Sequence, residues 1–265
     1  MLLKEILKSK GLKQKWLADK LGVSEVTVSS WCAGKSVQRK EHLKNLMSYL
    51  STYQFDFPYQ MNKSDNLLSF TVASLRLNEM VKVAQYFIEY DVLDLKQVKN
   101  ADIIFSGMKS LTFEKTFYQI RKRLETLTPV QIEILANGDL ISQKKIAFLS
   151  VCKCYSFIRD FTIEVIRDKV LMYDYQINET DFNSFIKNKL QEYPKLDGYS
   201  TSTFNKAKQV LFLILEQVGI IDNVRDKRIQ LQILHPTVIK AIADDDPSWL
   251  KIFMIPDRDI KQLKF

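Results

Sequence analysis

The segment QKWLADKLGVSEVTVSSWCAGK, residues 14–35, predicts two short helices joined by a tight turn. Apolar side chains at helical spacing mark the inner face of both helices, and these are Leu17, Ala18, Leu21, Val28 and Trp31. Gly22 reaches the positive φ angle that a sharp turn needs. Ser24 is placed as the N-cap of a helix from about Glu25 to Cys32, because its side chain can accept hydrogen bonds from the first turn.

Apolar stripes predict one further helix on either side of this segment, which makes residues 1–50 a four-helix module. The stripe of the first helix, which ends at Gly11, consists of Leu2, Leu3, Ile6 and Leu7. The stripe of the last helix, from about 41 to 50, consists of Leu43, Leu46, Met47 and Leu50. Because each helix has one apolar side, the four are expected to pack as a bundle.

The positive charge of the chain is concentrated in this module. The 265 residues carry 39 Lys and Arg against 31 Asp and Glu, a net charge of +8. Residues 1–50 carry ten Lys and Arg against four Asp and Glu, so +6 of the excess lies in under a fifth of the chain. Such a split is typical of a polyanion-binding module on a near-neutral body, although a solvated lysine surface has the same composition.

Residues 14–35 resemble the helix-turn-helix of Xre/Cro-type phage repressors. The matching features are Gln14 at the start of the second helix, Leu-Ala before Leu-Gly-Val-Ser, and then Thr-Val-Ser, Trp and Gly-Lys. The resemblance implies that the helix from Glu25 lies in the major groove of double-stranded DNA, with its N-terminal residues against base edges. The alternative is a helix-turn-helix that is retained as a protein-contact domain.

The resemblance also assigns the residues of a DNA interface. Phosphate contacts are implied at helix N-termini and in the basic segment that follows, at Gln14, Ser24, Lys35, Arg39 and Lys40. The recognition helix contributes Glu25, Val26, Thr27, Ser29 and Ser30. Glu25 would accept from a cytosine amino group, and Val26 would pack on a thymine methyl. Because the outward positions lack Arg, Asn and Gln, we expect low-to-modest sequence specificity.

Residues 51–68 are interpreted as an aromatic linker. Its aromatic residues are Tyr53, Phe55, Phe57 and Tyr59, with Pro58 interrupting their alternation. A flexible Gly/Ser tether would lack such side chains. We expect the linker to dock on a neighbouring part of the protein, with base stacking as the alternative.

Residues 69–265 are predicted to form a mainly α-helical body, because apolar residues recur there with a period of 3.6. The predicted helices span 73–90, 94–104, 112–126, 129–137, 139–150, 153–173, 179–191, 201–218, 236–243 and 247–254. Thr128 begins a capping-box pattern with Pro129 at the first helical position. Gly138 and Gly219 follow apolar runs, as helix stops do.

The hydrophobic period changes after Gly219. Apolar and polar residues alternate over 229–233, and a polar turn at 223–227 separates them from Ile220 and Ile221. This pattern predicts a β-hairpin, and two helices followed by a hairpin are similar to a winged helix. Basic residues here form a candidate second DNA surface, namely Lys206, Lys208, Arg225, Lys227 and Arg228. A solvated turn of mixed charge is the alternative.

The body resembles the BrxA family of bacterial phage-exclusion (BREX) systems over about residues 69–247. Its landmarks are SFTVASL near the start, RKRLETLTPVQIEILANGD from Arg121, YSFIRDFTIEVIRDK from Tyr155, Asp181-Phe182, STSTFNKAKQVLFLILEQVGII from Ser200, and His235-Pro236. The resemblance implies an all-helical accessory protein that works beside a methyltransferase and other defence components. It implies no enzymatic activity.

Catalytic and metal-binding patterns are missing from the sequence. It contains no phosphate-binding loop, no dinucleotide glycine pattern and no G-x-S-x-G motif. Three Cys and two His are too few for a multi-ligand zinc site or a disulfide framework. His42 and His235 are interpreted as surface or cap residues. Cys152 and Cys154 fall on different faces of a helix, so we expect core packing for at least one of them.

Charged clusters in the body receive structural interpretations. Asp244-Asp245-Asp246 stands before Pro247, which favours a helix cap over a divalent-metal site. Arg121, Lys122 and Arg123 point in three directions on a helix, so we expect a solvated face there. Glu164 and Arg167 have the spacing of a helical ion pair.

These features predict a non-enzymatic DNA-binding accessory protein that needs no cofactor and no metal. Its expected partners are double-stranded DNA and other phage-defence proteins, with a homodimer left open. The alternatives are a transcriptional regulator of its own operon, whose body serves for dimerisation, and a protein- or RNA-binding adaptor. The apolar runs from Ile146 and Val210 are far shorter than the roughly 20 residues of a membrane span. In residues 1–11 the lysines lie within the apolar pattern, whereas in a signal peptide the basic residues precede the apolar segment. We therefore expect a cytoplasmic protein.

Overall fold

The computed structural model describes residues 14, 15, 18, 23–32, 68, 70, 74–90 and 110–263. The chain divides into two compact units, Met1–Lys63 and Ser64–Phe265, and each is described by itself. The predicted helices at 2–11, 41–50 and 94–104 and the predicted linker up to residue 67 lie outside the described residues.

The described part of the N-terminal unit centres on helix α3 (Glu25–Cys32), which has the predicted bounds. Val28, Trp31 and Cys32 are buried, and so is Ala18 on the preceding helical segment. These burials confirm the predicted inner face wherever its residues are described. The opposite side of α3 therefore carries the polar residues.

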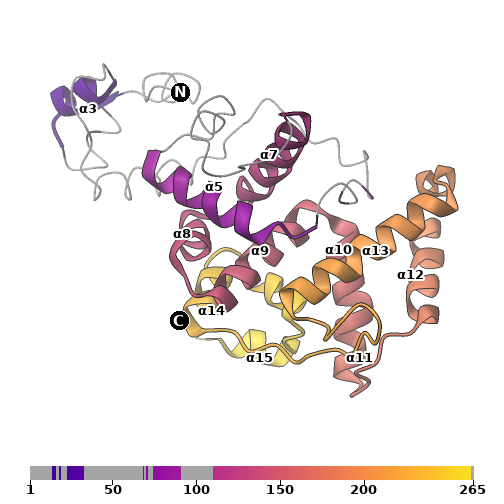
Figure 1. Ribbon diagram of the computed structural model, residues 1–265. Helices are drawn as coiled ribbons and strands as arrows, with labels where there is room; N and C mark the ends of the chain where they lie inside the picture. The colour runs from indigo at the N-terminus through magenta and orange to yellow at the C-terminus, as the bar shows by residue number, and fades with distance from the viewer. Residues whose placement is uncertain are drawn as a thin grey trace. The chain divides into compact units, whose positions relative to one another are not determined.

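The described part of the C-terminal unit is built from helices (Figure 1). Its α-helices are α5 (Leu77–Tyr90), α7 (Ser110–Leu124), α8 (Pro129–Asn137), α9 (Leu140–Cys154), α10 (Ser156–Phe161), α11 (Asp168–Leu171), α12 (Glu179–Glu192), α13 (Thr201–Val218), α14 (Pro236–Ala243) and α15 (Asp257–Gln262). The unit also contains a π-helix, η2 (Thr162–Arg167), and the 3₁₀-helices η3 (Pro194–Gly198) and η4 (Pro247–Phe253). The predicted bounds of α8, α13 and α14 are confirmed to the residue.

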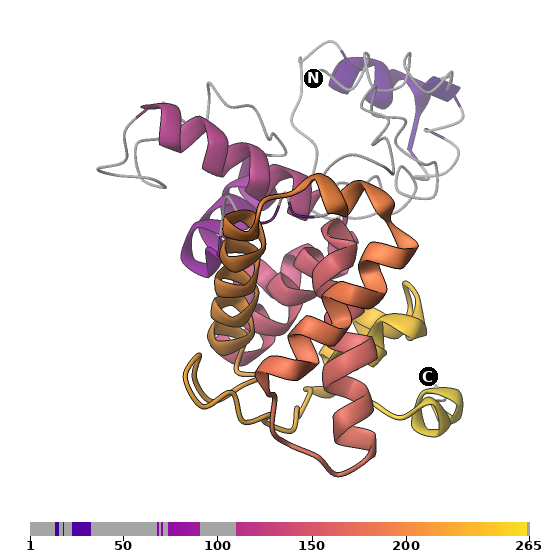
Figure 2. The same cartoon turned by 90° about the vertical axis from the view of Figure 1, so that its right-hand side faces the viewer.

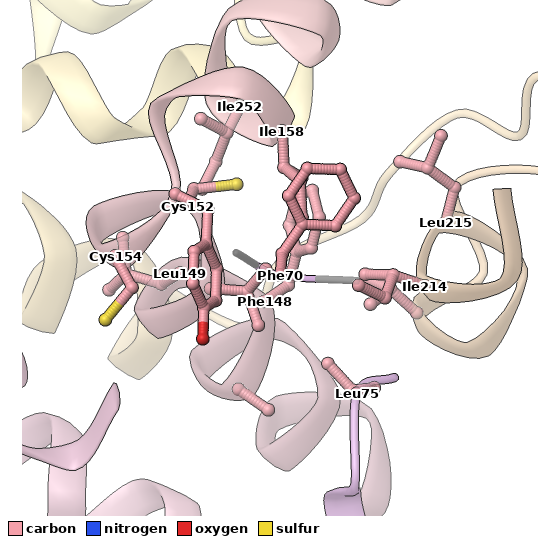
Figure 3. Close-up of a cluster of buried hydrophobic side chains, with 14 of the residues drawn as sticks. Phe70, Leu75, Phe148, Leu149, Cys152, Cys154, Ile158, Ile214, Leu215 and Ile252 are labelled. Atoms are coloured by element: carbon pink, nitrogen blue, oxygen red, sulfur yellow. The ribbon is translucent and has the colours of Figure 1, made fainter. Parts of the chain in front are cut away.

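Helix α9 forms the centre of this unit, in the middle of both views in Figures 1 and 2. It contacts α5, α7, α8, α10, α13, α14 and η4. Because neighbours surround it, consecutive residues are buried irrespective of helical face: Ile146, Ala147, Phe148, Leu149, Val151 and Cys152. Figure 3 shows Phe148, Leu149 and Cys152 in one buried cluster with Phe70 and Ile158.

Helix α13 shows the amphipathic pattern that the sequence predicts. Its buried side includes Ala207, Leu211, Ile214 and Val218, and Phe204 is half-buried. The helix ends at Gly219, whose φ of 79° lies in the left-handed region that favours glycine. Among the described residues, no helix combines the length and the apolar content needed to cross a membrane.

The helix predicted over 153–173 is instead interrupted at Tyr155. This residue is extended (φ −129°, ψ 97°) and separates α9 from α10. Its buried side chain donates a hydrogen bond to Gln119 Oε1 at 2.5 Å, and its ring lies 5.5 Å from the Arg123 guanidinium. Both partners belong to α7, so tertiary packing stabilises the interruption. The helix propensity of the local sequence does not indicate it.

The predicted β-hairpin and winged helix are wrong. Among the described residues, the connection between α13 and α14 forms two isolated bridges, Ile221 with Ile229 inside it and Arg228 with Gln176 before α12, and Figure 1 shows no strand arrow there. The alternating pattern does not mark a buried sheet face, because Ile229 is buried whereas Leu231 and Ile233 are exposed. The backbone of 228–230 bonds to Ile220 and Asp222, but that of 227–229 also bonds to Tyr175 and Ile177, a segment that the hairpin prediction left out.

Candidate nucleic-acid interface

Ser24 caps the N-terminus of α3, as predicted. Its Oγ accepts a hydrogen bond from the main-chain N–H of Thr27 at 3.2 Å and lies 2.8 Å from the Thr27 hydroxyl. The Ser24 carbonyl also accepts from Thr27 and Val28, so the first turn is closed locally. Among the described residues, no hydrogen bond engages the main-chain N–H of Glu25 or Val26. A helix end with such free N–H groups attracts anions.

The outward side of α3 is open to solvent. Glu25 and Ser29 are exposed, Val26 is 76% exposed, and Thr27 and Ser30 are half-buried. All five residues predicted on the recognition helix therefore lie away from its buried face. The side chains of these five residues are short, so another surface can approach the helix closely. They carry one negative charge and no positive charge.

The predicted phosphate contacts of this unit are described only in part. Gln14 is helical and half-buried, next to the exposed Lys15. Lys35, Arg39 and Lys40 lie outside the described residues. The cationic part of the predicted interface therefore stays a prediction.

Two residues of the predicted second DNA surface are engaged in an ion-pair cluster. Lys208 and Lys227 both pair with Glu179, the latter at 3.9 Å. Their Nζ atoms also lie 5.5 Å and 5.3 Å from the ring centroids of Phe182 and Phe212. The hydrogen bond from Lys208 lowers the pKa of the Glu179 carboxyl, so this acid stays ionised.

The other three residues of that surface, Lys206, Arg225 and Arg228, are exposed. Arg225 lies in a turn that Asn223 closes, because Asn223 Oδ1 accepts from the N–H groups of Arg225 and Asp226 at 2.9 and 2.7 Å. Arg228 bridges to Gln176 through its main chain. The structure therefore leaves three cationic side chains available, not five.

The three consecutive aspartates have separate structural roles. Asp246 caps η4 by accepting from the Ser248 N–H at 2.8 Å, which confirms the predicted cap before Pro247. Asp245 pairs with Lys153 at 2.5 Å, and Asp244 pairs with Lys240 at 3.3 Å. In the described part of the chain, no three His, Cys, Asp or Glu residues are arranged to hold a metal ion.

Cys152, Cys154 and His235 also have the structural roles that were predicted. Burial raises the pKa of the Cys152 thiol, and it raises that of Cys154 to about 11, so both stay protonated and unreactive at neutral pH. His235 Nδ1 accepts from the N–H of Thr237 and caps α14. His42 lies outside the described residues.

Two predictions about charged residues in the body are wrong. Arg123 is fully buried rather than solvated, and its guanidinium donates to the carbonyls of Ser74 and Leu75 at 2.9 Å. Helical spacing could have predicted this burial, because Arg123 follows the buried Ile120 by three residues and so lies on the same face of the helix. Glu164 and Arg167 do not pair with each other, since Lys189 binds Glu164 at 2.7 Å and Asp257 binds Arg167 at 3.2 Å.

Lys189 is a further buried cation that the sequence did not reveal. It bridges α12 to α10 and η2 by pairing with Asp160 and Glu164, and it pairs with Glu192 on its own helix. Burial opposes its charge, but these ion pairs outweigh it and raise the pKa of the amine. The arrangement holds the helices together and offers no free group for chemistry.

Comparison with known proteins matches both units. Residues 67–246 match the family described as BrxA, and residues 3–54 match the helix-turn-helix family. A "BREX protein BrxA" of Bacillus cereus (strain H3081.97) is 31% identical over 121 residues, 45% of this chain and 60% of that protein. A "BREX protein BrxA" of Escherichia coli O9:H4 (strain HS) is 26% identical over 130 residues, 48% of this chain and 61% of that protein. The matched segment thus spans less than two thirds of either relative.

A solved structure has a related fold. The crystal structure of an uncharacterized protein from Magnetospirillum magneticum superposes with a TM-score of 0.60 at 18% identity. The superposition covers 71% of this chain and 96% of the other. Because the BrxA match extends over more than half of the chain, and the helical body has this fold, the protein belongs to the BrxA family and carries a helix-turn-helix at its N-terminus.

Proposed function

We propose that this protein is a DNA-binding accessory protein of a bacterial phage-defence (BREX) system and performs no chemistry of its own. The helix-turn-helix unit holds duplex DNA with α3 in the major groove. The helical body docks other components of the system or adds contacts to DNA. Relatives named BREX protein BrxA and the helix-turn-helix match support this assignment.

The observation that carries the proposal is the two-sided character of α3. Val28 and Trp31 anchor one side in the core of the unit, while Glu25, Val26 and Ser29 face solvent beside the capped N-terminus. A recognition helix requires this arrangement, because its inner side must fix it in place while the outer side enters the groove. The +6 charge of residues 1–50 supplies the attraction to phosphate.

The exposed residues of α3 favour weak discrimination between sequences. Glu25 and Val26 offer one acceptor and one apolar contact, and Ser29 and Ser30 bond to either kind of partner. No outward Arg, Asn or Gln makes the bidentate base contacts that discriminate best. We therefore propose binding to most duplexes within roughly a factor of ten, and substitution of Val26 or Ser30 should alter preference more than affinity.

Salt titration of DNA binding tests the docking geometry. Duplex binding of the full chain is measured by fluorescence anisotropy at several salt concentrations, for the wild type and for Lys35→Ala/Lys40→Ala. The slope of log K against log salt should become flatter by about one for each lysine–phosphate contact that is lost. The change should be the same on random and on operon-upstream DNA. The control Lys187→Ala/Lys261→Ala removes the same charge from exposed positions of the body and should leave the slope unchanged. Equal slopes for all three proteins would reject the proposed interface.

The same titration separates the accessory protein from a transcriptional regulator. A regulator should prefer one palindromic site in its own operon by about a thousandfold or more. A protein- or RNA-binding adaptor should show no salt-dependent duplex binding. Either result would replace the accessory assignment.

We also propose a second DNA contact of the body through Lys206, Arg225 and Arg228, the exposed members of the basic cluster. Lys208 and Lys227 are left out because both pair with Glu179. Substitution of the three exposed residues by Ala should flatten the salt slope further when it is combined with the Lys35/Lys40 pair. An unchanged slope would limit DNA contact to the N-terminal unit.

A further inference from the structure

One carboxylate in the body is shared by two lysines from different elements. Glu179 is the first residue of α12, whereas Lys208 lies on α13 and Lys227 in the connection to α14. Oε2 of Glu179 accepts a hydrogen bond from Lys208, and Oε1 lies 3.9 Å from Nζ of Lys227. The second distance is too long for a hydrogen bond, so Glu179 balances the charge of Lys227 without satisfying its donors.

The two lysines are held in place by contacts other than Glu179. Their Nζ atoms lie 5.5 Å and 5.3 Å from the ring centroids of the buried Phe182 and Phe212. Nζ of Lys227 also donates to the Arg225 carbonyl at 3.4 Å. The side chains of Lys208 and Lys227 are only 23% and 18% exposed. Because packing fixes both ammonium groups, they are preorganised to receive an anion.

The carboxylate of Glu179 is the loosely attached member of this cluster. Its side chain is 62% exposed, and among the described residues only the two lysines pair with it. The hydrogen bond from Lys208 lowers the pKa of the carboxyl, so it is an anion at neutral pH. An exposed carboxylate can turn into water with little loss of contact, and the two ammonium groups would then face solvent.

Positive charge exceeds negative charge around the two lysines. Residues 206–208 and 222–228 together carry five Lys and Arg against two Asp. Asp222 is engaged within the connection, since its Oδ1 accepts from the N–H groups of Asn223 and Arg228 at 2.7 and 2.9 Å. Glu179 therefore offsets only part of the excess, and this surface attracts anions even while the carboxylate is in place.

We propose that Lys208 and Lys227 form a binding site for a phosphate group, and that Glu179 occupies this site in the free protein. A phosphate displaces the carboxylate and accepts hydrogen bonds from both ammonium groups, because its oxygens point in several directions. The contact between Glu179 and the lysines is thus autoinhibitory. The carboxylate competes with every phosphate that approaches the body.

The competition makes the body a conditional contact for nucleic acid. A duplex that is free in solution meets the closed site, whereas a duplex already held by the helix-turn-helix unit presents its phosphates at a high effective concentration. This role rests on the proposed function, because it takes the phosphate from a DNA backbone. The site itself depends only on the lysines and on Glu179.

Salt titration of duplex binding by the full chain tests the site with DNA. Glu179→Gln removes the competing charge at nearly constant size, so it should tighten binding at least threefold and steepen the slope of log K against log salt by about one to two. The control Glu133→Gln removes the same charge from an exposed side chain of α8 that bonds to Asn137, and it should leave the slope unchanged.

The lysines are tested in the background of Glu179→Gln. Adding Lys208→Met and Lys227→Met removes both cations but keeps apolar side chains against Phe182 and Phe212. The slope should return to that of the wild type. Circular dichroism and Tm check that each variant keeps the fold. A gain that persists without the two lysines would overturn the site.

Inorganic pyrophosphate tests the site without DNA. By isothermal titration calorimetry, Glu179→Gln should bind pyrophosphate at least threefold more tightly than Glu133→Gln. A gain with both probes supports a nucleic-acid backbone as the source of the phosphate, and a gain with pyrophosphate alone would replace it with a small phosphate compound. Equal binding of both probes by the two variants would overturn the proposal. Absence of duplex binding by every protein would count against the proposed function, while the pyrophosphate comparison still decides the site.

Discussion

The Nζ atom of Lys153 lies 2.5 Å from Oδ2 of Asp245, which ties the end of α9 to the turn after α14. Lys153 also donates to the Thr126 carbonyl at 2.9 Å and to Gln131 Oε1 at 3.2 Å. Gln131 in turn donates to the Ala241 carbonyl at 2.9 Å. One partly buried network thus joins α8, α9 and the turn after α14. Asp245 of the acidic triplet therefore has a structural role.

Asp245→Ala should reduce the free energy of unfolding by about 1–3 kcal/mol, because it leaves the largely buried Lys153 ammonium without its counterion. Asp244→Ala is the matched control, since its pair with Lys240 is exposed on both sides and should contribute no more than about 0.5 kcal/mol. Urea unfolding followed by circular dichroism measures both. Equal effects of the two substitutions would show that the network does not stabilise the fold. Addition of Ca²⁺ or Mg²⁺ should not stabilise either variant.

Arg123→Met should destabilise the body by about 1–3 kcal/mol. The substitution keeps most of the side-chain volume but removes the donors that satisfy the carbonyls of Ser74 and Leu75. Arg121→Met, two residues away, removes only a half-exposed pair with Glu125 and should change stability by less than about 0.5 kcal/mol. Unfolding in urea separates the two, and a larger effect at Arg121 would contradict the burial described for Arg123.

Gly138→Ala should destabilise the turn between α8 and α9 although φ at this position is an ordinary −73°. A Cβ atom there would lie 2.4 Å from the Ile134 carbonyl oxygen, so the backbone must shift, at a cost of about 1–2 kcal/mol. Gly198→Ala meets nothing within 4 Å and should be neutral or stabilise by up to about 1 kcal/mol. Thermal unfolding checks the contrast, and similar Tm changes would refute the close approach.

The free energy of unfolding should rise at alkaline pH because of the buried Lys145. Burial lowers the pKa of its amine from an ordinary 10.5 to about 8, and its partners, the Val218 carbonyl and Gln232, are uncharged. Between pH 8 and 10.5 the unfolded chain keeps a proton that the folded protein has released, so the free energy of unfolding rises with pH there. The rise is at most about 3 kcal/mol. Lys145→Met should lack it in urea unfolding at each pH, and identical pH profiles would show that the amine is not desolvated.

The sequence by itself was sufficient for the bounds of several helices. Helix α8 begins after the capping box at Thr128, and α13 ends at the left-handed Gly219, where the sequence places them. The predicted range 236–243 of α14 is also confirmed. The first turn of α3 likewise follows from Ser24. These signals act over a few residues, so periodicity and caps report them without knowledge of the fold.

Other features were decided by tertiary structure alone. The break at Tyr155, the buried Arg123 and the pairing of Lys189 with Glu164 depend on partners between 25 and 49 residues away. Residues 229–233 alternate like a strand, yet the body covers Ile229 and stops before Leu231. Alternation reports which residues share a face, but only the packed neighbours decide whether that face is covered. For this reason, the sequence could locate helix α3 and its cap at Ser24, while the exposure of Leu231 and Ile233 became visible only in the folded chain.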